Sequence, residues 1–522
     1  MKPRSSPFLR QLRRNRYWLT CFLAAEMGLL QIAQPLQAAS VTWTAGSGTD
    51  FNWANSANWR GGLPQLLDDL SFNAPIPNPG SLASPGTLNL GAGSTARSLR
   101  FNDSYTLQGG DLSLSLGALS VGAGSTARIS SVMTGSGGLQ KDGLGTLILD
   151  ADNTGLTGNV VLSSGTLVAS GQAKALGVGQ LRLIGGQLTL QGDTGLAFGN
   201  NTVVLGPVAI ASDRVSTGAG VTHSLGTLSI GGQTLSALAG PNVTSGTAGL
   251  TFGATTLTAS GTRFETGSGT NLTLGAMGGN FSIYKTGAGT LTLAGTSTRA
   301  NATSASVIYQ GRVVQGVAAG LGAATAPLFL AGGTTMQFSS DASTNAYPTT
   351  VFGNVNLVPD RATSGAAVTH TLGTLTSIGA NTYTVSAGAN IASLTADVRF
   401  GAATATGATS IVAGAGSRFT LNSTFINNGF DTTISGAGDV TLTGAVSGAG
   451  GILMNGNGLL TLSGANAQGK ATVVNSGRVQ LGGATALGAT AVANAVLNGL
   501  GVLSTNGQNV SVRTAPKRAR LS

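Results

Sequence analysis

The sequence has a single cysteine, Cys21, among 522 residues, and only 8% of its residues are charged and 5% aromatic. One cysteine excludes a framework of intramolecular disulfide bonds. The low charge, together with a hydrophobic fraction of 41%, excludes a chain kept disordered by charge repulsion. Proline is scarce, at 14 residues, and glycine follows no three-residue period, which excludes a collagen triple helix. With 82 glycines, the sequence indicates a packed protein with small side chains and many turns.

The formal net charge of +10 is concentrated at the two ends of the chain. Ten of the 27 basic residues lie within residues 1–20 and 513–520, and the other 17 are matched by 17 acidic residues. Basic residues dispersed among an equal number of acidic ones form no stripe that could follow a phosphate backbone. We therefore expect no nucleic acid partner.

The first 39 residues have the layout of an export signal. Basic residues precede an apolar stretch from Trp18 to Leu36, and two alanines follow it. We expect residues 1–39 to be a signal peptide for Sec-dependent export, so that the mature chain begins near Ser40. A membrane-spanning helix is the alternative, but the uninterrupted apolar run is short for one.

A unit of glycine followed by alternating apolar and small residues occurs three times and is each time followed by a second glycine-led strand. Short alternating strands between glycine corners, at a period of about 20 residues, are typical of a β-solenoid. One such coil cannot bury its apolar residues alone, so it is stable only when stacked on its neighbours. We predict an all-β parallel β-helix with coils of about 20 residues over residues 91–512. The units are Gly143–Leu149, Gly287–Leu293 and Gly456–Leu462, and the second strands begin at Gly165, Gly311 and Gly477, one period after Gly145, Gly289 and Gly458.

The first copy has a specific resemblance. Gly137–Leu149, followed by Asn153–Gly158, Gly165–Leu167 and Ala175–Gly177, resembles the autotransporter-associated β-strand repeat of bacterial surface passengers. The resemblance implies a right-handed parallel β-helix, export in an unfolded state and a role at the cell surface. Residues 40–90 are rich in tryptophan and resemble the segment that often precedes such arrays, so we expect them to cap the first coil.

At the C-terminus the sequence departs from this pattern. Such passengers are usually followed by a translocator barrel, and amphipathic strands of that kind are missing here. Residues 513–522 form a basic tail that we expect to be disordered. We therefore expect contact with an outer membrane only through a translocator that is not present in this chain. A truncated passenger and a freely released protein are both consistent with this ending.

The tryptophans Trp43, Trp53 and Trp59 are the first candidate binding surface. Aromatic rings can stack on sugars, which makes glycan binding one interpretation. The other is a cap that covers the first coil and blocks pairing with its open edge, as every solenoid requires. The cap is the interpretation that we favour.

Three polar, less repetitive segments interrupt the array, at residues 240–249, 299–306 and 341–350. Insertions in solenoids often form protruding loops, which are frequent sites of binding. Candidate contact residues in the last of them are Asp341, Asn345 and Tyr347. Slack connectors without a binding role are an equally weighted alternative.

The sequence shows no arrangement expected of a catalytic or metal site. His223 and His370 occupy matching copies of one short motif, which favours a structural role for both. The pairs Asp68–Asp69 and Asp150–Asp152 could in principle supply the acid and base of a polysaccharide-cleaving enzyme, but turn residues account for them better. We predict no catalytic residue, no cofactor and no metal.

Together these features predict an exported surface or secreted scaffold for adhesion or surface contact. Its expected partner is a host or neighbouring cell surface, a matrix or a glycan. The alternatives are a carbohydrate-active β-helix enzyme, either a polysaccharide lyase or a hydrolase, and a passive matrix component.

Overall fold

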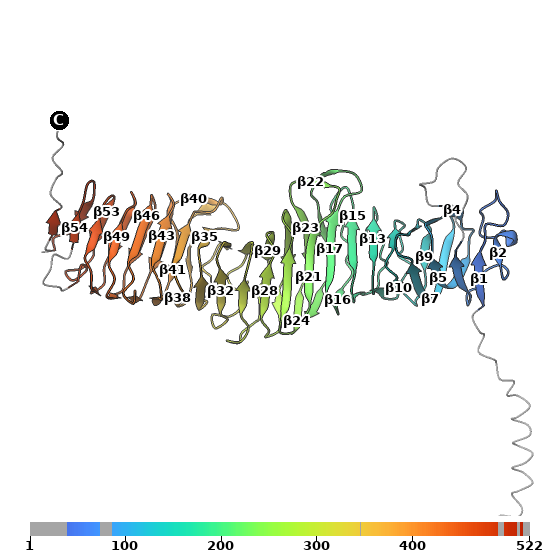
Figure 1. Ribbon diagram of the computed structural model, residues 1–522, viewed down its shortest axis with the longest axis horizontal. Helices are drawn as coiled ribbons and strands as arrows, with labels where there is room; N and C mark the ends of the chain where they lie inside the picture. Colours follow the sequence, from blue (N-terminus) through green and yellow to red (C-terminus); the bar gives the residue numbers. More distant parts are fainter. Residues whose placement is uncertain (1–38, 74–85, 345, 489–494, 509–511, 515–522) are drawn as a thin grey trace, which may run out of the picture.

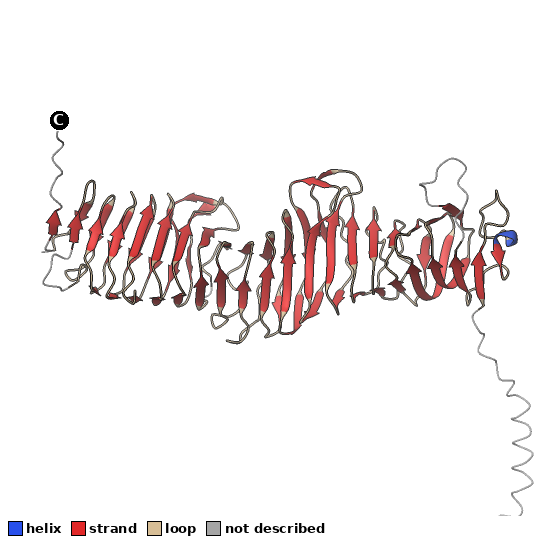
Figure 2. Ribbon diagram, in the orientation of Figure 1, coloured by secondary structure: helices blue, strands red, loops and turns tan. Residues whose placement is uncertain are grey.

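The computed structural model describes residues 39–73, 86–344, 346–488, 495–508 and 512–514. They form a parallel β-solenoid of about 19 turns, with roughly 22 residues in each coil. The strands stack side by side along the long axis of the molecule (Figure 1). Strands make up 50% of the protein, and the single helical element among the described residues is the short turn η1 (Ser56–Asn58) (Figure 2). The prediction of an all-β solenoid is confirmed.

The register of the stacked strands follows the glycine spacing of the sequence. In each repeat the glycine-led strand pairs in parallel with the second strand, one coil further along. Thr146, which follows Gly145, faces Thr166, which follows Gly165, as the repeats predict. The other two repeats pair in the same register. The three pairs are β11 (Thr146–Leu149) with β13 (Thr166–Ser170), β29 (Thr290–Leu293) with β31 (Arg312–Gln315), and β50 (Leu459–Leu462) with β53 (Arg478–Leu481).

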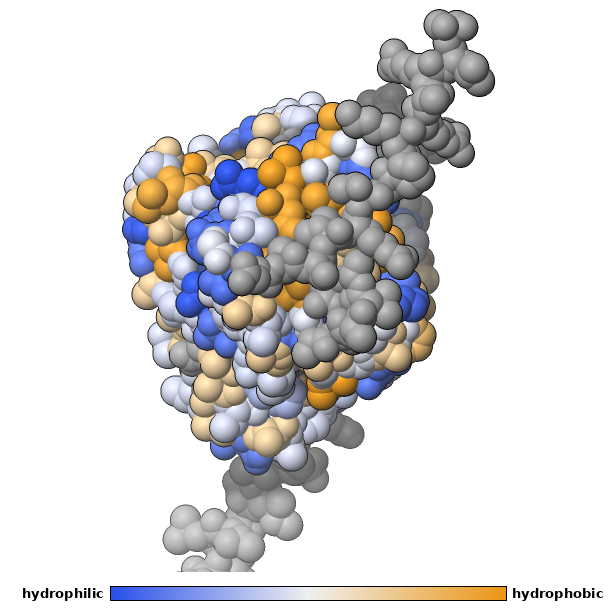
Figure 3. All heavy atoms as spheres, turned by 90° about the vertical axis from the view of Figure 1, so that its left-hand side faces the viewer, coloured by the Kyte–Doolittle hydropathy of each residue, from blue (hydrophilic) through white to orange (hydrophobic). Residues whose placement is uncertain are grey.

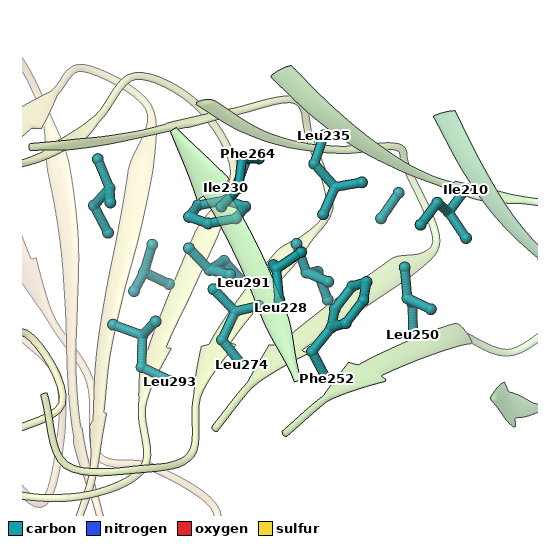
Figure 4. Close-up of a cluster of buried hydrophobic side chains, with 14 of the residues drawn as sticks. Ile210, Leu228, Ile230, Leu235, Leu250, Phe252, Phe264, Leu274, Leu291 and Leu293 are labelled. Atoms are coloured by element: carbon teal, nitrogen blue, oxygen red, sulfur yellow. The ribbon is translucent and has the colours of Figure 1, made fainter. Parts of the chain in front are cut away.

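Alternate side chains of each strand point into a core that follows the whole column. In β11, Leu147 and Leu149 are fully buried, whereas Thr146 and Ile148 are half-buried on the outer face. Parallel register places Leu147 opposite Leu167 of the next coil, so like residues pack on like. Figure 4 shows one stretch in which leucine, isoleucine and phenylalanine side chains of successive coils fill the interior. Each buried leucine stabilises the column by roughly 1.5–3 kcal/mol.

Glycine is required where successive corners stack closely. Gly165 has a φ of 70°, a conformation that residues with a Cβ rarely adopt. A Cβ at this position would lie 2.4 Å from the carbonyl oxygen of Gly143 and 2.5 Å from that of Gly145. Glycine at this corner therefore permits both the turn and the approach of the preceding coil.

A buried lysine closes the same corner. Lys141 is fully buried, and its Nζ donates to the carbonyl oxygens of Asp142 and Gly143, both at 2.9 Å, and to that of Ser164 at 3.2 Å. Lys285 makes the equivalent three bonds in the second repeat. Burial lowers the pKa of both ammonium groups to about 8. The two lysines thus bind together carbonyl groups that belong to neighbouring coils.

The number of strands in a coil changes along the column, because two sheets begin partway through it. Coils have two strand faces before β19, three from β19 to β27, two again up to β37, three from β37 to β51 and two beyond β51. Sheet I extends from β1 (Ser40–Trp43) to β27 (Met277–Gly278), sheet II from β4 (Gly86–Asn89) to β51 (Ala467–Gln468), sheet III from β19 (Thr222–Ser224) to β56 (Val512–Thr514), and sheet IV from β37 (Thr369–Thr371) to β55 (Val502–Ser504).

Coils are longer where the new sheets begin than in the three repeats of the sequence. In the first such coil Thr202 of β16 (Thr202–Val204) faces Leu228 of β20 (Leu228–Gly231). In the second, Leu375 of β38 (Leu375–Ser377) faces Ala403. These longer coils raise the average to roughly 22 residues, above the predicted period of about 20. Viewed from the C-terminal end, the face of the molecule that is coloured combines hydrophilic and apolar residues (Figure 3).

Parts of both chain termini lie outside the described residues. Residues 1–38, which hold nearly all of the predicted signal peptide, and residues 515–522 of the predicted tail lie outside the described residues. Strand β56 includes Arg513 and Thr514, so the solenoid extends past the predicted boundary at residue 512. In the described part of the chain there is no helix long and apolar enough to cross a bilayer.

Candidate functional site

The three tryptophans near the N-terminus pack against one another inside the first coil. Trp43 is fully buried, and Trp53 and Trp59 are only 5% and 6% exposed. The ring of Trp59 lies edge-on to both others, with centroid distances of 4.9 Å to Trp43 and 5.0 Å to Trp53. Its Nε1 donates to the carbonyl oxygen of Trp53 at 2.8 Å. Buried rings in mutual contact offer no stacking platform to a sugar.

The same segment also covers an edge of the first sheet. Strand β2 (Trp59–Arg60) pairs with β1 antiparallel, whereas the other partner of β1, β3 (Asp69–Phe72), is parallel. A reversed strand at the end of a parallel stack leaves less of the edge open to another chain. The tryptophan segment therefore has the packing of a cap.

The segment 341–350 is tied to the column, contrary to the expectation of a free loop. Tyr347 is fully buried, and its hydroxyl lies 3.1 Å from the carbonyl oxygen of Ala318 and 3.2 Å from Nε2 of Gln315. Asp341 is exposed and forms an ion pair with Arg361 at 3.2 Å. Asn345 lies outside the described residues. Tyr347 is thus a core residue, although its neighbours in the sequence are polar.

The segment 299–306 is likewise held in place, by Arg299. This arginine is fully buried, and its guanidinium donates to the carbonyl oxygens of Phe281 at 3.1 Å and Ala305 at 2.9 Å, and to Oγ of Ser306 at 3.0 Å. Further bonds reach the carbonyl oxygens of Ser304 and Leu321. Burial lowers the pKa of the guanidinium to about 10. The segment is a fixed corner of the solenoid.

Within the described residues two parts protrude, and both project from the same side of the column (Figure 1). The first is built on β18 (Gly218–Ala219) and β22 (Val243–Ser245), which pair only with each other. The second is built on β36 (Gly365–Ala366) and β40 (Ile391–Ser393), which do the same. The first protrusion includes the predicted polar segment 240–249, and the second has no counterpart among the predicted loops.

A histidine and an aspartate brace the base of each protrusion in the same way. The imidazole Nε2 of His223 lies 2.9 Å from the carbonyl oxygen of Asp213, and that of His370 lies 2.8 Å from the carbonyl oxygen of Asp360. Both rings are fully buried, and burial lowers the pKa of both. Each histidine stands on the first strand of a new sheet, β19 or β37. Their role in the described structure is structural.

An arginine holds the first turn of each protrusion. In the first, Nη2 of Arg214 lies 3.4 Å from Oδ1 of Asp193, while Nε and Nη1 donate to the carbonyl oxygens of Ser216 and Ala219, both at 3.1 Å. In the second, Arg361 makes the equivalent bonds to Asp341, Thr363 and Ala366. The two protrusions are therefore copies of one braced structure.

Most side chains at the tips are small, but Val215 on the first protrusion is 51% exposed. Leu394 on the second protrusion is 75% exposed and has a φ of 65°, where a residue with a branched side chain is unusual. The first protrusion has Gly246 with a φ of 67° at this place in the loop. The copies thus share a backbone but differ in what their tips present.

The paired carboxylates do not converge on a common centre. Asp69 forms an ion pair with Arg97 at 3.0 Å, and Asp68 accepts from the amide of Gln65 at 2.8 Å. Asp150 pairs with Arg128, and Asp152 accepts from the amide of its neighbour Thr154 at 3.1 Å. Within the described ranges no three histidine, cysteine, aspartate or glutamate side chains lie close enough together to hold a metal ion.

A surface that the sequence analysis did not find lies on the outer face of sheet II. Four aromatic side chains, which we call the aromatic strip, come from successive coils and form two stacked pairs. The ring centroids of Tyr284 and Tyr309 are 6.1 Å apart, and those of Phe329 and Phe352 are 6.4 Å apart. The strip lies on or beside β28 (Ile283–Thr286), β30 (Ser306–Ile308), β32 (Leu328–Ala331) and β34 (Thr349–Phe352).

Register brings the aromatic strip together. Tyr284 faces Val307, and Val307 faces Phe329, so these side chains form one outward row across three coils. Tyr309 and Phe352 lie beside this row and are 46% and 45% exposed. The signal in the sequence was an aromatic residue at outward positions where other coils carry threonine, such as Thr376 and Thr404.

Comparisons with known proteins identify no relative. No family model matches the chain, and no curated protein and no solved structure matches it. The structure itself defines the class of the protein as a parallel β-solenoid.

Proposed function

We propose that the protein is an exported scaffold that holds protruding loops at fixed positions along a stiff column and mediates contact with another surface. The observation that carries this proposal is the pair of equivalently braced protrusions on one side of the solenoid (Figure 1). Loops held by the bonds of a buried histidine and of a surface arginine keep their shape without a partner, which lowers the entropic cost of binding one.

The spacing of the protrusions supports simultaneous contact by both. Six steps between paired strands of sheet II lead from β17 (Val208–Asp213), at the base of the first protrusion, to β34, just before the second. At about 4.8 Å for each step, the tips are separated by roughly 30 Å along the column. Two weak contacts at a fixed separation bind a surface with repeated sites far better than either does alone.

Export and surface location are part of the proposal and rest on the basic and apolar N-terminal sequence. The resemblance to autotransporter-associated repeats points the same way, since passengers of that kind act outside the cell. Accessibility of an epitope tag to antibody on intact bacteria, compared with lysed cells, tests this part. A tag that is detected only after lysis contradicts it.

Adhesion is tested with beads coated with the purified protein and applied to cells, matrix and abiotic surfaces. The variant Thr244→Asp with Ala392→Asp places a charge on an exposed position of each protrusion, and we expect several-fold weaker attachment. The control Thr87→Asp with Thr256→Asp adds the same charge at exposed positions of other strands. Equal attachment of both variants and the wild type contradicts a role for the protrusions and favours a passive matrix component.

A further inference from the structure

The aromatic strip is partly exposed, at Tyr309 and Phe352, without a structural reason in the described part of the chain. Outward positions of a solenoid need no large apolar side chain, and the same row continues as Thr350, Thr376 and Thr404 in the coils that follow. Only three aromatic side chains among the described residues are more than 40% exposed, and two of them, Tyr309 and Phe352, belong to the strip. Exposed apolar surface gathered in one place marks a site of interaction.

Polar groups converge beside the first aromatic pair. A shallow hollow on the outer face of sheet II is lined by Arg263, Glu265, Thr286, Tyr309 and Gln310. Arg263 faces Tyr284 on the neighbouring strand, and Glu265 faces Thr286. The hollow thus combines an aromatic ring with guanidinium, carboxylate, amide and hydroxyl groups within one small area.

Part of this polar group is free to bind a ligand. The guanidinium of Arg263 makes no hydrogen bond or ion pair with the residues that the structure describes, and its side chain is exposed. Oε1 of Gln310 accepts a hydrogen bond from the amide of Gly287 at 3.2 Å. This bond does not use the NH₂ group of Gln310. One carboxylate oxygen of Glu265, Oε2, accepts a hydrogen bond from Oγ of Ser236 at 2.7 Å. This bond does not use the second carboxylate oxygen, Oε1.

We propose that this surface, the aromatic strip with Arg263, Glu265 and Gln310, binds an extended neutral polysaccharide that lies along the column axis. Sugar rings offer apolar C–H faces and equatorial hydroxyls, and this surface offers aromatic rings followed by donors and acceptors of hydrogen bonds. The one positive and one negative side chain of the hollow balance, which suits a neutral polymer better than a polyanion. The coils repeat at about 4.8 Å, close to the length of one sugar unit, so consecutive sugars meet consecutive coils.

This site goes beyond the proposed scaffold role and does not depend on it. It uses neither protrusion, and purified protein in solution is sufficient to observe it. Loss of adhesion by the charged protrusion variants with retained glycan binding, or the reverse, therefore separates the two proposals.

The test is affinity electrophoresis of the purified full chain in gels that contain hydroxyethyl cellulose, xyloglucan, galactomannan or dextran, with polygalacturonate as the acidic probe. We expect retardation by at least one neutral polymer. The double variant Tyr309→Ala with Phe352→Ala is expected to bind at least tenfold more weakly, and Arg263→Ala several-fold more weakly. All four positions used here, including the control below, are exposed, so circular dichroism should be unchanged.

The matched control is Phe430→Ala, which removes the third exposed aromatic side chain, outside the strip. It should bind as the wild type does. The proposal is overturned if no neutral polymer retards the protein, if only polygalacturonate does, or if the double variant and the control lose binding equally.

Discussion

The imidazole of His223 is joined to the main chain of Asp213 across the base of the first protrusion. Its Nε2 lies 2.9 Å from the carbonyl oxygen of Asp213, which can only accept, and its Nδ1 accepts from the amide of Leu196 at 3.1 Å. Both bonds are satisfied by the neutral ring with its proton on Nε2. A second proton, on Nδ1, would face the amide hydrogen of Leu196.

Acid should therefore loosen the protrusions. Burial lowers the pKa of His223 and His370 below 6.5, so at pH values between the folded and unfolded pKa the unfolded chain binds more protons than the folded one. The contribution of the two neutral histidines to the free energy of unfolding is fully present above pH 6.5 and is lost as the pH falls below that value. We expect a lower melting temperature at pH 5 than at pH 7, measured by circular dichroism. The variant His223→Gln with His370→Gln should show a smaller difference, and an equal one contradicts the assignment.

The buried lysines act at the opposite end of the pH scale. Their pKa of about 8 lies below the unfolded value of 10.5, so the unfolded chain again binds more protons as the pH rises from 8. Stability should increase between pH 8 and 9.5, measured by urea unfolding. Above that range the pKa of Tyr383, raised by burial to about 12, acts with the opposite sign.

A lysine-free control exists within the sequence itself. Met454 stands in the third repeat where Lys141 and Lys285 stand in the first two. The variant Lys141→Met with Lys285→Met should fold and should lose the rise in stability between pH 8 and 9.5. A rise of unchanged size in this variant would show that other groups cause it.

Replacing Arg299 should destabilise the middle of the column. The variant Arg299→Met preserves much of the volume but leaves five acceptors, three of them in buried bonds, without their donor, which we expect to cost about 3 kcal/mol of unfolding free energy. The measurement is urea unfolding at pH 7. Arg263→Met, at an exposed position without a partner among the described residues, is the control and should change stability by less than about 0.5 kcal/mol.

Removing the tryptophan cap should expose the first coils. Trp59→Ala deletes a buried ring that contacts both Trp43 and Trp53, and it should cost about 3–5 kcal/mol. Because each coil contacts only its neighbours, the loss should be local. Amide exchange should accelerate in β1 and β3 and remain unchanged in β50. Protection that persists in β1 and β3 would contradict a capping role.

Local pattern was sufficient to predict the fold. The alternation of Thr146, Leu147 and Leu149, and the distance from Gly145 to Gly165, together determine which face is buried and how long the coil is. The buried face and the coil length depend on backbone geometry and on burial, and these act within one coil and its neighbour. They are therefore visible in a short stretch of sequence.

The surfaces were harder to predict because they depend on register over several coils. Tyr284, Tyr309, Phe329 and Phe352 are each unremarkable in sequence and meet only through the stacking of four coils. Tyr347 shows the reverse, since its polar neighbours suggested a loop although its ring lies in the core. The second protrusion was missed because the residues on and beside β40 include Ile391, Ala392 and Leu394, which do not form a polar interruption of the array like residues 240–249.

The account depends most on the stacking of weak coils into one column. Small-angle X-ray scattering of the purified protein measures this directly. We expect a distance distribution with an early maximum and a long, nearly linear decline, as given by a rod on the order of 90 Å long for about 19 turns. A symmetric, bell-shaped distribution, as a compact globule of this mass gives, would contradict the central claim.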